Sequence, residues 1–411
     1  MPLLGSQSSG TKGAPTAPTI GTVTLTNSTT VSIPFTAPNS KLPITSYTTV
    51  SSPSIALSTS GTSSPLTVTG SFTAGQAYTF TIVANTENGN SGASSSSNSI
   101  TYIEPRAAYF PGGDAAITNT QYSNIDKILF ADDTKSTLSA TLSNPTIQHT
   151  GFANSGTAGY SIGGQLVGSG PLTTIDKILF ANDTKSTLAT GLPNTTTTAT
   201  GFANSGTAGY VAGGVVNNSA YTSAIRKLVF SNDGISTIGA TTALAGGQRT
   251  SFANSGTAGY ILAGANSPAN TAELQYTTTI QKLLFSNDSR TTLSAVLSTG
   301  RNLAAGAANS GTAGYIAGGS SYPGNISNIE KLLFSNETRV GVSATLSPGR
   351  RTAAGAANSG TAGYFAGGFS PSAPLSSINK LAFSGETITT LSGTLSTNRE
   401  IPCGFANSAG V

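Results

Sequence analysis

The sequence is poor in the side chains that carry most enzyme chemistry. Among its 411 residues it has one histidine, His149, one cysteine, Cys403, and no tryptophan. One histidine cannot build a multi-histidine metal site, and one cysteine excludes an intramolecular disulfide as well as the Cys/His zinc patterns. His149 lies in a predicted loop without the partnering motif that a hydrolytic triad needs, and we expect a solvated imidazole there. We therefore expect no catalytic residue, no metal site and no cofactor, and we expect Cys403 to be a small strand residue.

Charged side chains are also scarce, because they make up 8% of the chain, with a formal net charge of +4. No run of lysine or arginine occurs, so the sequence does not indicate a nucleic-acid groove. The first residues, M-P-L-L-G-S-Q-S-S-G, lack the basic and apolar regions of an export signal. No stretch approaches the roughly 18 uninterrupted apolar residues of a membrane span. We expect a protein assembled in the cytoplasm, without nucleic acid as a partner and without membrane insertion.

Repetition is what the chain has in abundance. The phrase A-G-Y-x-x-G-G, in its fullest form, occurs six times, and its tyrosines lie 51, 50, 50, 55 and 49 residues apart. Such a period is typical of propellers and solenoids. The tyrosines are Tyr109, Tyr160, Tyr210, Tyr260, Tyr315 and Tyr364.

One repeat predicts a four-stranded antiparallel meander. Between Leu303 and Arg350, four short apolar or alternating segments are separated by N-S-G-T, a long loop and S-N-E-T, which are turn-forming sequences. Glycine and alanine crowd the first segment, residues 304–308, as a blade that tapers toward a central axis requires. An aromatic residue ends the third segment of every repeat and is expected to fill the space between blades. These residues are Phe130, Phe180, Phe230, Phe285, Phe334 and Phe383.

This order of elements, with the double glycine after the tyrosine as its most specific part, resembles the Kelch repeat over about residues 105–411. The resemblance implies an all-β fold with a six-bladed Kelch-like β-propeller. The usual tryptophan of the fourth strand is missing, and one unit has Ala263 and Gly264 in place of two glycines. The first unit begins at its tyrosine strand, whereas residues 404–411 form a first strand without a successor. We expect this C-terminal strand to be the innermost strand of the first blade and to close the ring.

Residues 15–104 have a different character. Alternating runs such as V-S-I-P-F and Y-T-F-T-I-V-A-N, parted by Pro, Gly, Asn and Ser, predict a β-sandwich. The pattern resembles a fibronectin type III domain, and the resemblance implies that Tyr78 pins a corner of the sandwich through its hydroxyl. Residues 1–14 are rich in Gly and Ser and are expected to be a flexible arm.

Two further patterns recur once per repeat. Acidic or amide residues occupy the turns between the third and fourth strands, where turn formation is favoured over calcium binding. These turns start at Asp132, Asn182, Asn232, Asn287, Asn336 and Gly385. Recurrent lysines are expected to lie along the blade, although a ring of six ammonium groups that binds anions remains an alternative. They are Lys127, Lys177, Lys227, Lys282, Lys331 and Lys380.

The repeats predict a candidate binding surface at one end of the ring. In a meander the N-S-G-T turn emerges on one face, whereas the variable second loops and the connections between blades emerge on the other. Units that are constant on one face and diverse on the other suggest a scaffold with a binding surface. Tyrosine and arginine suit binding hot spots and contacts to sugars or carboxylates. The candidate ligand-binding residues are Tyr122, Tyr221, Tyr276, Tyr322, Arg249, Arg301, Arg350 and Arg399. The alternative is that these arginines only brace neighbouring loops.

Together these features favour a non-enzymatic structural or binding protein of a virus particle. The Ser/Thr/Asn-rich repeats resemble in style those of bacteriophage tail and fibre proteins. The arm and sandwich are expected to attach to other virion proteins in an oligomeric assembly, while the propeller face contacts a host surface glycan or a neighbouring subunit. A bacterial surface adhesin or carbohydrate-binding protein is the alternative. An enzyme on a propeller scaffold is disfavoured, because the variable face is poor in carboxylates and histidine.

Overall fold

All regular structure in the described part of the chain consists of β-strands. The computed structural model describes residues 14–27, 29–73, 76–102, 106–115, 120–266, 275–400 and 403–408. The expected arm at 1–14 therefore lies almost wholly outside the described residues. Within the described ranges, no helix reaches the length and apolarity of a membrane span. The chain divides into two compact units, Met1–Glu104 and Pro105–Val411, and this boundary coincides with the change in sequence character.

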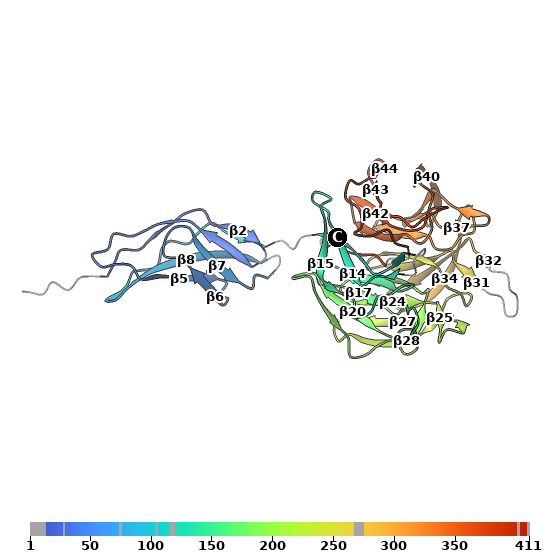
Figure 1. The fold of residues 1–411 in the computed structure, drawn as a ribbon, viewed down its shortest axis with the longest axis horizontal. Coiled ribbons are helices and arrows are strands. Elements are labelled where there is room, and N and C mark those ends of the chain that lie inside the picture. Colours follow the sequence, from blue (N-terminus) through green and yellow to red (C-terminus); the bar gives the residue numbers. More distant parts are fainter. Residues whose placement is uncertain are drawn as a thin grey trace, which may run out of the picture. The chain divides into compact units, whose positions relative to one another are not determined.

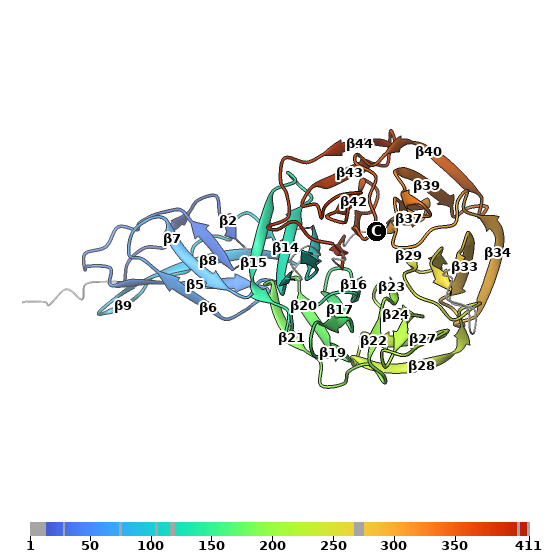
Figure 2. The same ribbon diagram turned by 45° about the vertical axis from the view of Figure 1, so that its right-hand side comes forward.

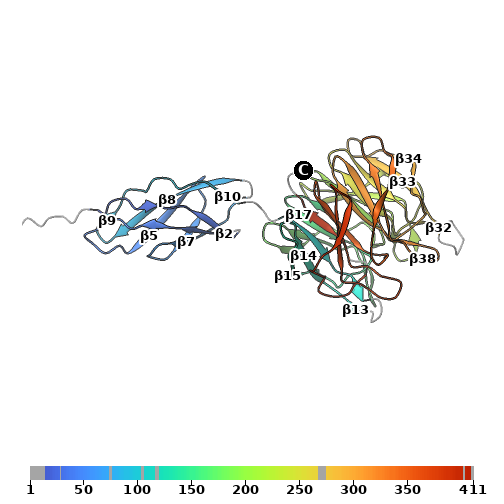
Figure 3. The same ribbon diagram turned by 90° about the horizontal axis from the view of Figure 1, so that it is seen from above.

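The first unit contains two four-stranded antiparallel sheets and a two-stranded ribbon, which Figures 1 and 3 show from two sides. One sheet has the order β2 (Thr24–Asn27), β3 (Thr30–Ile33), β7 (Leu66–Gly70), β6 (Leu57–Ser60). The other has β10 (Ile100–Thr101), β8 (Ala77–Thr86), β5 (Ser46–Ser52), with β9 (Gly89–Asn90) on β8. The ribbon pairs β1 (Thr19–Ile20) with β4 (Phe35–Thr36).

Alternating burial places one face of each of these strands in a common core. In β8, every second side chain is buried, including Tyr78, Phe80 and Ile82. The Tyr78 hydroxyl accepts a hydrogen bond from the Thr73 amide at 3.1 Å, and its ring packs edge-on against Phe72. This contact ties the start of β8 to the segment before it, at the position where the sequence predicted a corner tyrosine.

The second unit contains six four-stranded antiparallel sheets, here numbered 1 to 6. Sheet 1 has β45 (Phe405–Asn407), β11 (Ala107–Pro111), β14 (Asn124–Leu129) and β15 (Lys135–Thr141); sheet 2 has β16 (Thr150–Asn154), β17 (Ala158–Ile162), β20 (Ile175–Leu179) and β21 (Thr184–Thr187). Sheet 3 has β23 (Thr200–Asn204), β24 (Ala208–Ala212), β27 (Ala224–Val229) and β28 (Gly234–Thr241); sheet 4 has β29 (Thr250–Asn254), β30 (Ala258–Leu262), β33 (Thr279–Leu284) and β34 (Arg290–Val296). Sheet 5 has β35 (Ala305–Asn309), β36 (Ala313–Ala317), β39 (Asn328–Leu333) and β40 (Arg339–Thr345); sheet 6 has β41 (Ala354–Asn358), β42 (Ala362–Ala366), β43 (Ile378–Ala382) and β44 (Thr387–Thr390).

The six sheets follow one another around the unit (Figure 2), with β28, β34 and β40 outside and β16, β23 and β29 toward the middle. Their first strands contact one another in the succession β16, β23, β29, β35, β41, β45, and β45 also contacts β16. In sheet 1, β45 pairs with β11 in the register Tyr109 with Phe405. The C-terminal strand thus supplies the first strand of the N-terminal sheet, which is the pairing expected from the sequence.

The two ends of this unit carry different segments. In sheet 2, Asn154 pairs with Ala158 at one end of the strands and Thr150 pairs with Ile162 at the other. We call the end with the N-S-G-T turns the turn rim, and the end with the second loops and the connections between sheets the loop rim.

Short ribbons occupy the loop rim. They are β12 (Asp114–Ala115) with β13 (Thr120–Gln121), β18 (Gln165–Leu166) with β19 (Gly170–Pro171), β22 (Thr196–Thr197) with β25 (Val215–Val216) and β26 (Ala220–Tyr221), β31 (Ala265–Asn266) with β32 (Gln275–Tyr276), and β37 (Ser320–Ser321) with β38 (Gly324–Asn325).

Aromatic pairs fill the space between neighbouring sheets. The ring of Tyr160 stacks on Phe230 of the next sheet, with centroids 5.4 Å apart and planes 16° apart. The same contact joins every neighbouring pair, so the prediction for the six phenylalanines is confirmed. In five of the six repeats a glycine precedes the tyrosine. In sheet 3 this glycine makes room for a phenylalanine of the preceding sheet's first strand, because a Cβ on Gly209 would lie 2.0 Å from the Phe152 ring.

The backbone conformation of the second glycine of Y-x-x-G-G explains why this residue is a glycine. In the divergent repeat, Ala263 has φ of 57°, which alanine can adopt, whereas Gly264 has φ of 104°. The latter region is open essentially to glycine alone. The repeat therefore tolerates the first substitution and retains the second glycine.

Candidate functional site

Hydrogen bonds between neighbouring sheets explain the constancy of the turn rim. The Asn204 Oδ1 accepts from the Gly256 amide at 2.8 Å, and the Ser255 Oγ accepts from the Ser205 amide at 3.2 Å. Equivalent asparagine bonds are made by Asn154, Asn254, Asn309 and Asn407, and equivalent serine bonds by Ser155, Ser205, Ser310 and Ser359. The N-S-G-T sequence was interpreted as turn chemistry, but within the described residues its asparagine and serine also join the sheets at five of the six junctions, from sheet 1 to sheet 6.

The recurrent lysines and acids join the sheets further out. Asp233 accepts hydrogen bonds from the Tyr160 hydroxyl at 3.0 Å and from the Lys177 ammonium at 2.7 Å, both in the preceding sheet. The same three-residue clamp occurs at all six junctions, with Asp133, Asp183, Asp288, Glu337 and Glu386 as the other acids. Burial and the neighbouring carboxylate raise the pKa of the Tyr260 hydroxyl to about 12, so the tyrosine remains a donor.

In these turns, two adjacent residues have different roles: one forms the turn and the other contacts the neighbouring sheet. The first residue forms the turn: the Asp132 Oδ1, for example, accepts from the Thr134 amide at 2.9 Å. The second, Asp133, has φ of 57° and points its carboxylate at the neighbouring sheet. Every recurrent lysine is paired with such an acid, so the alternative of six ammonium groups that share an anion is not supported.

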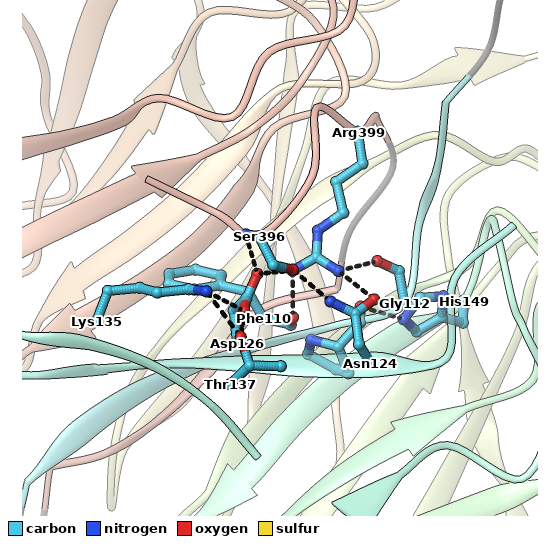
Figure 4. A network of polar contacts seen from close by, with 10 residues as sticks. Phe110, Gly112, Asn124, Asp126, Lys135, Thr137, His149, Ser396 and Arg399 are labelled. Atoms are coloured by element: carbon cyan, nitrogen blue, oxygen red, sulfur yellow. Dashed lines mark hydrogen bonds and ion pairs between the residues drawn. The ribbon is translucent and has the colours of Figure 1, made fainter. Parts of the chain in front are cut away.

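The predicted arginines of the loop rim are buried. Arg301, Arg350 and Arg399 are 0% exposed, and Arg249 is 7% exposed. Figure 4 shows how Arg399 donates to the carbonyl oxygens of Gly112 and Phe110 and to the Asp126 carboxylate. Burial raises the pKa of Asp126, but Arg399 and several hydrogen bonds more than offset it, so that the pKa lies below its ordinary value.

Arg350 occupies the equivalent place one sheet earlier than Arg399, and Arg301 occupies it two sheets earlier. Arg301 donates to the Gly318 carbonyl at 3.2 Å and pairs with the buried Glu330. Arg350 donates to the Gly367 and Ser377 carbonyls at 3.0 and 3.2 Å. The guanidinium groups therefore bind backbone of the next sheet, and the structure favours the bracing alternative over a ligand-contacting role.

Arg249 braces the loop rim from a different sequence position. Its repeat has Gly246 where the others have Arg301 or Arg350, and a Cβ on Gly246 would lie 2.8 Å from the Arg249 guanidinium. Arg249 donates to the Gly246 and Leu244 carbonyls and to Asn266, at 2.8 to 2.9 Å. Burial lowers the pKa of this side chain to about 10.

The predicted tyrosines lie on the loop rim in four different sheets. Tyr122, Tyr221 and Tyr276 are half-buried, whereas Tyr322 is 90% exposed. Each belongs to the second loop of its sheet, as expected. None of the four lines the pocket described next, so the structure does not gather the predicted residues into one site.

A pocket of about 310 Å³ opens at the loop rim where the first strands of all six sheets begin. We call it the central pocket. Arg249 is the one predicted candidate in its wall. The wall is formed by residues 148–151, 198–201, 248–251, 303–306 and 351–355, together with Glu400, Cys403 and Gly404.

Backbone hydrogen bonds between sheets shape the mouth of the central pocket. The Gln248 amide donates to the Thr198 carbonyl at 2.8 Å, and the Leu303 amide donates to the Gln248 carbonyl at 3.0 Å. The same bond links Thr198 to Gln148 and Thr352 to Leu303. All five residues have φ between 53° and 56°. Within the described residues, sheets 2 to 6 thus each place one left-handed residue in a hydrogen-bonded series around the opening.

The central pocket has a polar side and an apolar side. Sheets 2 to 4 contribute the hydroxyl groups of Thr150, Thr200 and Thr250, whereas sheets 5 and 6 contribute Ala305 and Ala354 at the equivalent positions. The Thr250 hydroxyl donates to the Ala304 carbonyl, and the Thr200 and Ser251 hydroxyls are hydrogen-bonded to each other, both at 2.6 Å. Within the described residues, the buried Thr198 Oγ1 has no partner.

Charge is concentrated on one wall, at the junction of sheets 6 and 1. Arg351 lies over the Phe369 ring at 4.6 Å from the ring centroid. Glu400 accepts from the Thr352 hydroxyl at 3.3 Å, and burial raises its pKa while Arg351 opposes the rise. Beside it, Asp114 pairs with Glu400 through the backbone, and burial together with the Glu400 charge raises the Asp114 pKa to about 6.

His149 and Cys403 are both buried in the wall of the central pocket. Burial lowers the pKa of His149 to about 4, so the imidazole is neutral at pH 7, and its Nε2 lies 3.2 Å from the Pro111 carbonyl. The expectation of a solvated loop imidazole was therefore wrong, because the ring packs under the loop of sheet 1. The Cys403 thiol is 4% exposed. Within the described ranges, no three His, Cys, Asp or Glu residues are grouped so that they could hold a metal ion.

Comparisons with known proteins identify no relative. No protein-family model matches the chain, and no curated protein matches its sequence. The function of the candidate site is therefore inferred from its geometry.

Apart from Arg249, the predicted ligand-binding residues do not include those that shape the central pocket. Arg351 and Glu400 occupy one repeat position, which the backbone bridges align with Ile147, Gly247 and Asn302. Only two repeats carry a charge there. The charge at this position becomes visible when the repeats are compared position by position rather than motif by motif.

Proposed function

We propose that the second unit is a six-bladed β-propeller of the Kelch type and that the first is a sandwich of the fibronectin type III kind. The circular succession of first-strand contacts supports the former. So does the pairing of β45 with β11, because the C-terminal strand completes the four strands of the first sheet and joins the two ends of the repeat array. The Tyr78 hydroxyl bond supports the latter.

We infer that the protein is a non-enzymatic structural and binding component of a virus particle, a bacteriophage tail or fibre protein. One observation carries the binding role: a preformed pocket lies at the rim that also carries the variable loops. The sheets around it are joined by six Tyr–Lys–acid clamps, so that the pocket is held on a rigid support. The sequence supports assembly in a particle, through the scarcity of charge and of cysteine.

In this proposal the N-terminal arm and sandwich attach to other virion proteins, and the loop rim faces a host surface glycan or a neighbouring subunit. Detection of the chain by mass spectrometry in purified particles from cells that carry its gene tests the location. Binding of the full chain to polysaccharide extracted from the host surface tests the recognition. Particles that lack the chain would exclude a virion role.

A bacterial surface adhesin or carbohydrate-binding protein is the second candidate, and the same pocket supports it. The two differ in location alone. Recovery of the chain from washed cell envelopes, and not from particles, would favour the adhesin.

A further inference from the structure

We propose that the central pocket binds one neutral sugar residue that carries a methyl group, as a 6-deoxy or an N-acetyl sugar does, with Arg351 and Glu400 holding its hydroxyls. This inference depends on the proposed glycan-binding function and assigns its ligand. Size is the first argument. At about 310 Å³ the pocket lies at the lower end of ligand sites, which run from about 300 to 1,000 Å³. A small rigid ligand suits such a volume, whereas an extended peptide does not.

The two sides of the pocket call for an amphipathic ligand. On one side are the hydroxyls of Thr150 and Thr200, and on the other are Ala305 and Ala354. A fully hydroxylated ligand would leave hydroxyls unpaired against the alanines, at a cost in binding free energy. A sugar with a methyl substituent places polar groups on one side and the methyl group on the other.

The charged wall presents donors and an acceptor next to each other. The Arg351 guanidinium has no hydrogen-bond partner within the described residues, and its stacking on Phe369 restricts it before a ligand arrives. The Glu400 carboxylate accepts only the long bond from the Thr352 hydroxyl within those residues. A pair of neighbouring sugar hydroxyls can accept from Arg351 and donate to Glu400 at the same time.

The same wall disfavours an anionic ligand. A carboxylate or phosphate would satisfy Arg351, but Glu400 would repel it, and Asp114 adds a second acidic group close by. The other arginine of the wall, Arg249, already donates to three acceptors. The charged side chains of the pocket wall therefore favour a neutral ligand over an anionic one.

The position of the charged pair in the repeat supports a binding role. Four of the six repeats have uncharged residues there, namely Ile147, Thr197, Gly247 and Asn302. Those sheets have the same backbone bridge to the second loop, so the fold does not require a charge at this position. Arg351 and Glu400 face one pocket from adjacent sheets. They make one side of the pocket charged, whereas the equivalent positions of the other sheets are uncharged.

Titration of the full chain with methyl glycosides, followed by ligand-observed NMR and calorimetry, tests the inference. We expect methyl α-L-fucoside or N-acetylglucosamine to bind at least about tenfold more tightly than methyl α-L-galactoside or glucose, their hydroxyl-bearing counterparts. Arg351→Met should weaken binding on the order of tenfold or more. Arg290→Met is the matched control, because Arg290 lies on the outermost strand of sheet 4 and donates to Thr241 and Thr292.

Two further variants keep the test informative if Arg351→Met does not fold. Phe369→Leu retains both charges and removes the stacking, and Glu400→Gln retains the shape and removes the acceptor charge. Both should weaken sugar binding while the thermal midpoint stays close to that of the unmodified chain. Equal binding by all three variants would overturn the inference, as would preferential binding of acidic sugars.

Failure of the inference and failure of the proposed function give different results. If the full chain binds host polysaccharide and Arg351→Met binds it equally well, glycan recognition stands and the central pocket is not its site. If neither polysaccharide nor any of the monosaccharides binds, both the pocket ligand and the glycan role are wrong. Detection in purified particles would then leave the contact with a neighbouring subunit as the function.

Discussion

The Asp133 carboxylate accepts a hydrogen bond from the Tyr364 hydroxyl at 2.9 Å, although 231 positions separate the two residues in the sequence. The same carboxylate pairs with the Lys380 ammonium at 2.7 Å. This clamp is one of six similar contacts, and it joins the last sheet to the first. All three side chains are partly or wholly buried, so the contact is better shielded than a surface ion pair.

We expect Asp133→Ala to destabilise the chain by about 1 to 3 kcal/mol, because it leaves the Tyr364 hydroxyl and the Lys380 ammonium without their acceptor. Asp233→Ala removes the equivalent clamp between sheets 2 and 3 and is the matched control. Urea unfolding measures both. If the clamp at the junction of sheets 6 and 1 holds the ends of the repeat array together, Asp133→Ala should also increase proteolysis near the C-terminus, and Asp233→Ala should not.

The glycine that precedes the tyrosine in five of the six repeats allows a steric test with an internal control. A Cβ on Gly209 would lie 2.0 Å from the Phe152 ring, whereas on Gly363 the nearest atom is the Ala307 Cβ at 3.0 Å. We expect Gly209→Ala to cost about 2 to 3 kcal/mol, and Gly363→Ala to cost less than about 1 kcal/mol. The double variant Gly209→Ala, Phe152→Ala removes the clash. A thermal midpoint no lower than that of Phe152→Ala alone agrees with a clash, whereas additive losses would contradict it.

The buried arginines differ in what their removal leaves behind. Arg399→Met leaves the buried Asp126 carboxylate with Lys135 as its one remaining cation, so we expect a loss of about 3 kcal/mol. Arg350→Met removes donors from backbone carbonyls only, and we expect a loss of about 1 to 2 kcal/mol. Denaturant midpoints of the two variants measure the difference. Sugar binding that survives Arg350→Met would agree with a bracing role, whereas its loss without unfolding would restore the ligand-contacting prediction.

The raised pKa of Asp114 predicts that the stability of the chain depends on pH. Its pKa is about 6 in the folded chain against 3.8 as the ordinary value, so the folded state binds this proton more tightly than the unfolded state. The carboxyl therefore lowers the free energy of unfolding as pH rises from about 4 to about 6, and the full penalty remains at pH 7.

We expect Asp114→Asn to stabilise the chain at pH 7 by about 1 to 3 kcal/mol and to have little effect at pH 4. Asp132→Asn, in an exposed turn of the same sheet, is the control without this gain. Thermal unfolding over pH 4 to 8 measures both variants. An equal gain at pH 4 and pH 7 would show that the effect is not the titration of Asp114.

Much of the fold is readable from the sequence because it depends on local patterns. Tyr160 and its five counterparts give the period, and the turn sequences give four strands per repeat. The phenylalanines at the ends of the third strands were predicted as contacts between sheets, because a regular aromatic position in a strand is usually buried. Tyrosine, lysine and acid also recur in every repeat, but only the sheet geometry brings Tyr160 and Lys177 onto Asp233.

The candidate site is where sequence reasoning was least successful. Arg301, Arg350 and Arg399 were predicted on an exposed rim, because arginine suits both binding and bracing, and their burial depends on the loops that fold over them. His149 was predicted in solvent because it lies in a loop without a partnering motif, and its burial depends on the packing of the loop of sheet 1 over the ring. The central pocket joins segments from all six repeats, so no single stretch of sequence encodes it.

The sequence by itself determined an all-β chain with a repeated four-stranded unit, since strand alternation and turn formation act over a few residues. Only the tertiary structure decided which side chains meet across the sheets, which arginines are withdrawn from solvent, and where one charged pair faces a pocket. The physical reason is distance along the chain: these contacts join residues about 50 to 290 positions apart, and their formation depends on how whole sheets pack rather than on local conformation.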